Sequence, residues 1–157
     1  MHTPNYDFEK DFPVARKTEK QIAKFLVDEL NMKFIGECDN SDYDIKMETA
    51  DGKQFTVEIK EDFSCERTGN IGVEIESWGR KSGIAVSKAT LYLYKIHEPS
   101  GRKSMYVIPT TKLKRMIKEK LWHREVIGGD PGSNSRNYLF ALPIVKQNFT
   151  FLGTLPK

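Results

Sequence analysis

The chain has few of the residues that cross-link a protein or anchor it in a membrane. Its two cysteines, Cys38 and Cys65, are too few for a disulfide framework, and nothing resembles a paired-cysteine zinc site. No apolar run approaches the roughly 20 residues that cross a bilayer. The first residues also lack the apolar core of a signal peptide. We therefore expect a protein of the reducing cytoplasm with no membrane partner.

Several catalytic signatures are also missing. His2, His97 and His123 share no spacing typical of metal ligands, so a histidine-dependent nuclease or a zinc site is unsupported. The sequence contains neither a glycine-rich phosphate loop nor a Ser/His/Asp arrangement with a matching context. Candidates for chemistry must therefore come from other side chains.

Length and composition indicate one ordinary folded domain spanning 1–157. A chain of 157 residues can bury a core without cross-links, and its 38% hydrophobic and 30% charged content is that of a soluble, ordered protein. Residues 1–13 are predicted to form an N-terminal arm. The segment 128–137 is rich in Gly, Ser, Asn and Pro, which predicts a mobile loop.

The basic residues are clustered, although the net charge is only +3. One cluster, between 112 and 124, contains a single acid, Glu119, among Lys112, Lys114, Arg115, Lys118, Lys120 and Arg124. A second cluster consists of Arg80, Lys81 and Lys88. Clustered cations are what phosphate binding requires, so we predict DNA contacts from Arg80, Lys81, Lys88, Lys114, Arg115 and Lys118. A solubilising helix face is the alternative.

Hydrophobic periodicity predicts an α/β fold with a single mixed β-sheet flanked by helices. Helices are expected at 14–31 and 110–121, with a short helical turn at 85–89. Strands are expected from alternating or apolar runs at 33–39, 43–47, 55–60, 71–76, 91–96, 105–108 and 138–145. Pro143 favours an edge position for the last of these strands.

Two of the strands form a β-hairpin that separates apolar from polar side chains. One side gathers the apolar residues Tyr43, Ile45, Met47, Phe55, Val57 and Ile59, and the other gathers Asp44, Lys46, Glu48, Thr56, Glu58 and Lys60. A two-residue Asp51-Gly52 turn would place apolar residues opposite charged ones. A three-residue loop with a left-handed residue removes this conflict and sets Asp44 opposite either Glu58 or Lys60.

The polar side of the hairpin has the residue types of a hard-metal site. Mg²⁺ prefers oxygen ligands and is commonly bound by one or two carboxylates together with water and substrate phosphate. A bound cation would also reverse the local negative charge, so that acidic residues could lie beside a phosphate backbone. The alternative is a solvated hairpin face.

Asp44, followed after thirteen residues by Glu58-Ile59-Lys60, resembles the motif of the PD-(D/E)XK nuclease superfamily. This superfamily includes many restriction enzymes and the archaeal Holliday-junction resolvases. The resemblance covers 19–96 in element order and implies a restriction-endonuclease-like core of order α-β-β-β-α-β. One departure is Tyr43, which stands where the family name implies proline.

The resemblance implies a role for each motif residue. Asp44 and Glu58 would hold one or two Mg²⁺ ions, with Mn²⁺ as a substitute, and Ile59 would contribute its backbone carbonyl. Lys60 would position or activate the attacking water. Glu19 resembles the helix-1 glutamate that reaches toward the metal in many members, although an acid in a first helical turn is also favoured by the helix dipole.

The sequence leaves alternative roles open for further acidic and aromatic residues. Glu74 either extends the metal site or faces water, and Glu76 is expected to face water. Trp78 and Tyr92 either stack on bases or belong to the core.

We therefore predict a Mg²⁺-dependent DNA endonuclease that acts by direct hydrolysis and, by family analogy, as a homodimer on two strands. Two alternatives use the same fold without chemistry. One is a non-catalytic nucleic-acid-binding module, and the other is an interaction subunit of a larger complex.

Overall fold

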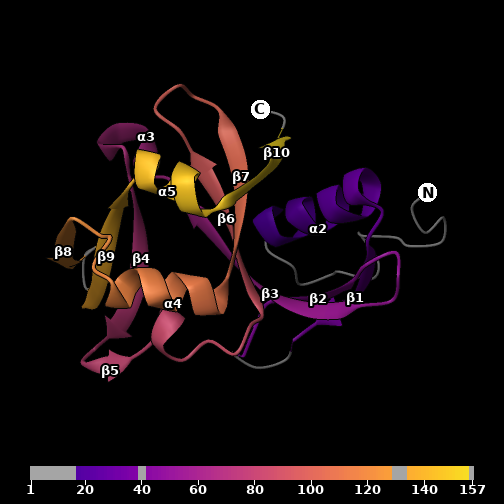
Figure 1. Ribbon diagram of the computed structural model, residues 1–157, viewed down its shortest axis with the longest axis horizontal. Helices are drawn as coiled ribbons and strands as arrows, with labels where there is room; N and C mark the ends of the chain where they lie inside the picture. Colours follow the sequence, from indigo (N-terminus) through magenta and orange to yellow (C-terminus); the bar gives the residue numbers. More distant parts are fainter. Residues whose placement is uncertain (1–16, 39–41, 129–133, 156–157) are drawn as a thin grey trace.

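The computed structural model describes residues 17–38, 42–128 and 134–155. The predicted N-terminal arm, 1–13, lies outside the described residues, as does 129–133 of the predicted mobile loop. Within the described part, the chain forms two β-sheets and several helices (Figure 1). The α/β class predicted from periodicity is confirmed.

The first sheet is mixed and has six strands in the order β1-β2-β3-β6-β7-β10. Among the strands that the structure describes, β3 and β6 form the only parallel pair of this sheet, and the other neighbours are antiparallel. The strands are β1 (Lys33–Glu37), β2 (Ile45–Glu48), β3 (Gln54–Asp62), β6 (Leu91–His97), β7 (Lys103–Pro109) and β10 (Thr150–Leu155). The β3–β6 junction places the hairpin beside the most buried strand of this sheet.

A second, antiparallel sheet has the order β5-β4-β9-β8, so the prediction of a single sheet is wrong. Its strands are β4 (Asn70–Ser77), β5 (Arg80–Lys81), β8 (Arg124–Ile127) and β9 (Ser135–Ala141). The alternation at 71–76 indicated a strand correctly but not its neighbours, which are β5 and β9. The apolar face of β4, formed by Ile71, Val73 and Ile75, packs against the first sheet instead of extending it.

The hydrophobic core lies on both faces of the first sheet. On one face, α2 (Lys17–Leu30) packs Ile22 and Leu26 against Ile45 and Val57. On the other face, Tyr94 and Ile108 of the first sheet pack against the second sheet, together with side chains of α4 (Thr110–Lys118) and α5 (Leu142–Asn148). The first sheet is therefore the middle layer, with α2 on one side and the second sheet on the other (Figure 1).

Several predicted boundaries are wrong for local reasons. The strand expected at 138–145 ends at Ala141, because Pro143 lies in the first turn of α5, where a missing N–H costs nothing. The helix expected to reach 121 ends at Lys118, and the helical turn expected at 85–89 is a 3₁₀ turn at Gly83–Ala85, η1. Residues 135–137 of the predicted loop belong to β9.

The remaining short element, α3 (Cys65–Thr68), links the first sheet to the second. Among the described helices, none has the length and apolar character needed to span a membrane.

Candidate active site

The register of the β2–β3 hairpin agrees with the three-residue loop expected from its pattern. Ile45 pairs with Val57 and Met47 with Phe55, which keeps apolar residues opposite one another. The Thr49 N–H donates to the Lys53 carbonyl at 2.8 Å and leaves three residues, Ala50 to Gly52, outside the ladder. Gly52 has φ +89°, a conformation that side chains other than glycine rarely adopt.

Asp44 lies at the end of the hairpin ladder, immediately before β2. Its backbone N–H donates to the Val57 carbonyl at 3.0 Å. Its Oδ2 accepts a hydrogen bond from the Ile59 N–H at 2.6 Å. The carboxylate is therefore held against the backbone of the Glu58–Ile59 segment.

Glu58 and Lys60 belong to β3 and pair with Tyr92 and Tyr94 of β6. Burial raises the pKa of Glu58 above its ordinary value, and the nearby negative charge of Asp44 raises it further. The Lys60 ammonium, whose Nζ lies 3.4 Å from Glu58 Oε2, opposes this rise in the pKa. The structure thus brings together the three side chains that the sequence motif singled out.

The two carboxylates suit a divalent cation on chemical grounds. The raised pKa of Glu58 means that its ionised form is disfavoured, first because the carboxylate is buried and second because it lies near the negative charge of Asp44. A bound cation would relieve this repulsion. No three His, Cys, Asp or Glu side chains of the described residues are arranged to hold a metal by themselves. A pair of carboxylates completed by water and phosphate is nevertheless the usual environment of Mg²⁺.

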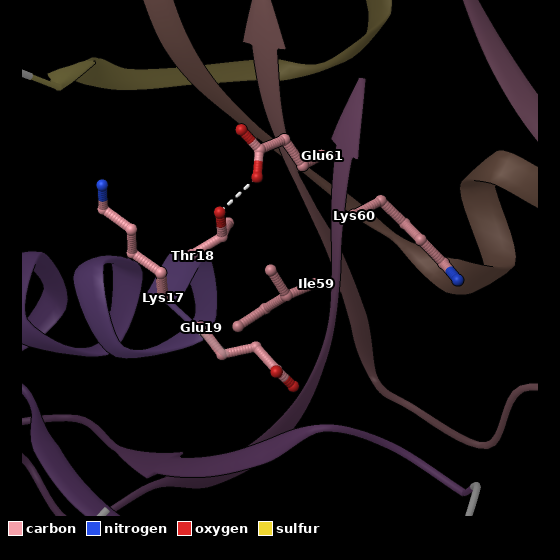
Figure 2. A pocket seen from close by; sticks show the side chains of 6 residues that line it. All are labelled: Lys17, Thr18, Glu19, Ile59, Lys60 and Glu61. Atoms are coloured by element: carbon pink, nitrogen blue, oxygen red, sulfur yellow. Dashed lines mark hydrogen bonds between the residues drawn. The ribbon is translucent and has the colours of Figure 1, made fainter. Parts of the chain in front are cut away.

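Glu19 lies in the first turn of α2, at a cavity of about 460 Å³. Figure 2 shows it beside Ile59, while the Lys60 side chain extends to the other side of β3. The Glu19 charge contributes to the raised pKa of Glu58, though less than burial and Asp44 do. The predicted helix-1 acid is therefore close enough to influence Glu58 electrostatically.

Sequence reasoning missed a polar network on the α2 side of β3. Glu61 Oε2 lies 2.7 Å from His97 Nε2 and 3.3 Å from Lys95 Nζ, and Glu61 Oε1 accepts a hydrogen bond from Thr18. Burial alone would raise the pKa of Glu61, but these contacts outweigh it and lower the pKa. Lys95 also donates to Gln21 at 2.9 Å and so links β6 to α2. The sequence signal for this network was Lys95, which stands inside the largely apolar strand β6.

The predicted DNA-contacting residues fall in three places. The Lys88 N–H donates to the Asp42 carbonyl at 3.1 Å, and its Nζ lies 3.9 Å from Asp42 Oδ1, two residues before Asp44. Arg80 and Lys81 form the exposed edge strand β5 of the second sheet. The exposed face of α4 carries the other three, Lys114, Arg115 and Lys118. Lys88 therefore contacts the segment that immediately precedes Asp44 of the candidate site.

The remaining acidic and aromatic candidates differ in their burial and in their hydrogen-bond partners. Tyr92 is a core residue with 1% of its surface exposed, whereas Trp78 is 68% exposed at the β4–β5 turn. Glu76 is paired with Arg136 at 2.9 Å. Glu74 accepts a hydrogen bond from Ser82 Oγ at 2.8 Å and lines a cavity together with Lys60.

In comparisons with known proteins, no family model, curated protein or solved structure matches this chain.

The raised pKa of Glu58 predicts a pH-dependent gain in stability for Glu58→Gln. Because folded Glu58 holds its proton more tightly than the unfolded chain does, the stabilisation from proton binding is lost as the pH rises through its folded-state pKa. With metal removed at neutral pH, we expect Glu58→Gln to exceed the wild type in unfolding free energy by roughly 0.5–2 kcal/mol. The difference should vanish well below pH 4.5, the ordinary pKa.

Urea unfolding across this pH range, with EDTA present, measures the difference. The control is Glu29→Gln, on the exposed face of α2. A Glu58→Gln protein that is less stable than the wild type at neutral pH would contradict the predicted sign.

Proposed function

We propose that the protein is a metal-dependent DNA endonuclease that hydrolyses phosphodiester bonds. The observation that carries the proposal is the juxtaposition of Asp44, Glu58 and Lys60. Asp44 is anchored on the Ile59 N–H, its charge raises the pKa of Glu58, and Lys60 Nζ lies 3.4 Å from Glu58. Two adjacent carboxylates with an ammonium beside them are suited to phosphodiester hydrolysis assisted by Mg²⁺.

Each residue has a distinct task in this proposal. Asp44 and Glu58 would hold Mg²⁺ or Mn²⁺, with the Ile59 carbonyl as a further oxygen ligand. The ion would supply Lewis-acid stabilisation and lower the pKa of a bound water. Lys60 would orient that water and offset negative charge that develops on the phosphoryl oxygens. Glu19 would add negative charge at the edge of the same site.

The arrangement of elements supports a restriction-endonuclease-like fold as part of the proposal. A helix, α2, precedes the three antiparallel strands β1, β2 and β3, and β3 then pairs in parallel with β6. Asp44 lies immediately before the second of these strands, and Glu58 and Lys60 lie on the third. Between β3 and β6 the chain passes through α3, β4, β5 and η1 and not through one helix alone, so the support for the expected α-β-β-β-α-β order comes from its first four elements and the parallel β3–β6 pair.

The proposal is tested by a cleavage panel on the purified chain. Supercoiled plasmid, single-stranded DNA and a four-way junction are incubated with Mg²⁺, with Mn²⁺ and with EDTA. We expect cutting of at least one substrate with either metal and none with EDTA. Failure to cut all three with both metals would overturn the nuclease proposal and favour a binding module or an interaction subunit.

We further propose a homodimer, because a chain of 157 residues covers few base pairs and cleavage of two strands calls for two sites. Light scattering of the chain alone and with DNA measures the stoichiometry. A two-to-one complex of protein and duplex is expected, and a one-to-one complex would contradict the dimer while leaving the chemistry intact.

Lys88 is expected to contribute one phosphate contact near the candidate site. Lys88→Ala should weaken DNA binding about equally for all sequences and reduce the slope of log affinity against log salt by about 1. Fluorescence anisotropy at several salt concentrations measures this slope. Lys24→Ala, which removes an exposed α2 lysine paired with Asp28, is the matched control and should leave the slope unchanged.

A further inference from the structure

A second cavity, of about 170 Å³, lies between the two sheets. Lys60, Tyr92 and Tyr94 line it from the first sheet, and Glu74 and Asn137 line it from the second. The Lys60 side chain, which pairs with Glu58, is therefore also part of this cavity. A substrate group placed here would lie directly beside the proposed catalytic lysine.

The second-sheet wall presents polar groups that the folded chain leaves open. Glu74 Oε2 accepts from Ser82 at 2.8 Å, and its Oε1 has no hydrogen-bond partner within the part of the chain that the structure describes. The same holds for the side-chain amide of Asn137. On the first-sheet wall, the buried Tyr92 hydroxyl lies near Ser87, whose side chain partly offsets the rise in the Tyr92 pKa that burial causes. Glu74 and Asn137 are half-buried, so their open polar atoms are accessible to water and to a polar ligand that displaces it.

The size and charge of the cavity narrow the class of ligand. At roughly 30 Å³ per water molecule, a volume of about 170 Å³ holds one small ring system and not a whole nucleotide. The carboxylates of Glu74 and Asp62 on the walls would repel a phosphate. They favour a neutral group that donates hydrogen bonds, while Lys60 at the same cavity attracts the phosphate attached to that group.

We propose that this cavity binds one nucleobase that carries an exocyclic amine, beside the phosphate held at Lys60. Glu74 Oε1 would accept a hydrogen bond from the amine, as carboxylates do from cytosine N4. The Asn137 amide would pair with a neighbouring ring nitrogen or carbonyl, as asparagine side chains do with the N6 and N7 atoms of adenine. This inference rests on the proposed nuclease function and adds a base preference to it.

A base reaches the cavity only when it is unpaired or turned out of a duplex, so single strands are the direct probe. Fluorescence anisotropy is used to compare oligo-dA, oligo-dC, oligo-dT and an abasic strand, with EDTA present so that no strand is cut. We expect oligo-dA and oligo-dC to bind about tenfold more tightly than the other two strands.

Two variants assign the preference to the cavity. Glu74→Leu removes the acceptor, and Gly72→Ala narrows the cavity at a position where an added Cβ would meet Asn137 Oδ1 at 3.6 Å, an ordinary contact. Both should reduce the preference to less than about threefold. Glu76→Leu, on the same strand but paired with Arg136, is the matched control and should retain it. Thermal melting checks that each variant is folded.

The outcomes separate this inference from the nuclease proposal. Equal binding of the four strands by the wild type, or a preference that Glu74→Leu and Gly72→Ala both leave unchanged, overturns the base site even if plasmid is cut. A preference lost in both variants supports the base site even if no substrate is cut.

Discussion

Asp44→Ala and Lys60→Ala are each expected to reduce DNA cleavage by at least about 10²–10³-fold while DNA binding is retained. Asp44 would supply a metal ligand, and its removal would leave Glu58 as the remaining side-chain ligand of the pair. Lys60, whose Nζ lies 3.4 Å from Glu58 Oε2, would place its ammonium group beside the attacking water. Single-turnover cleavage with Mg²⁺ measures the loss, and anisotropy with EDTA measures binding.

A matched control comes from the same hairpin. Lys53 is exposed, and its backbone carbonyl closes the loop with Thr49, far along the strand from Lys60. Lys53→Ala should cut DNA at close to the wild-type rate. Unaltered cleavage by Asp44→Ala or Lys60→Ala would instead place the three residues on an ordinary solvated face and support a non-catalytic role.

Asp62→Ala is expected to lower the free energy of unfolding by about 2–4 kcal/mol. Asp62 is 9% exposed and lies at the end of β3. Its carboxylate accepts hydrogen bonds from the backbone N–H groups of Cys65 and Gly72, both at 2.9 Å. The Ser64 hydroxyl also donates to it at 3.0 Å. Asp62 thereby joins the first sheet to the start of β4, and its loss would leave three donors without their charged acceptor.

Urea denaturation measures this loss. Asp28→Ala is the control, because Asp28 forms an exposed ion pair with Lys24 on α2, and such pairs contribute about 0–1 kcal/mol. If the two variants lose equal stability, Asp62 does not join the sheets in the manner described.

The hairpin could be predicted from sequence because everything that determines it is local. The alternation from Ile45 to Ile59 and a glycine in the turn specify which side chains share a side. The three-residue loop followed from the same pattern, and Gly52 has the left-handed conformation that such a loop requires. The proximity of Asp44, Glu58 and Lys60 is a consequence of this local geometry.

The second sheet could not be predicted, because strand partners are determined by contacts between distant residues. The pattern at 71–76 is equally consistent with either sheet, and its pairing with β9 depends on residues far along the chain. Pro143 likewise suits both an edge strand and a first helical turn, and the packing of Leu142 and Val145 into the core decides for the helix. The cavity between the sheets was therefore outside the reach of sequence patterns.

The Glu61 network was missed for a related reason. Glu61 and Lys60 are neighbours in sequence but project to opposite faces of β3, so they belong to different environments. The partners of Glu61 come from α2 and from β6, and only the packed structure brings Thr18, Lys95 and His97 to one carboxylate.

The proposed metal site is tested most directly by measuring metal binding at Asp44 and Glu58. Free Mn²⁺ is followed by electron paramagnetic resonance during titration of the wild type, Asp44→Asn and Glu58→Gln. We expect the wild type to bind Mn²⁺, excess Mg²⁺ to displace it, and each substitution to weaken binding at least about tenfold. Equal Mn²⁺ binding by all three proteins, or none by the wild type, would contradict a metal site at these carboxylates.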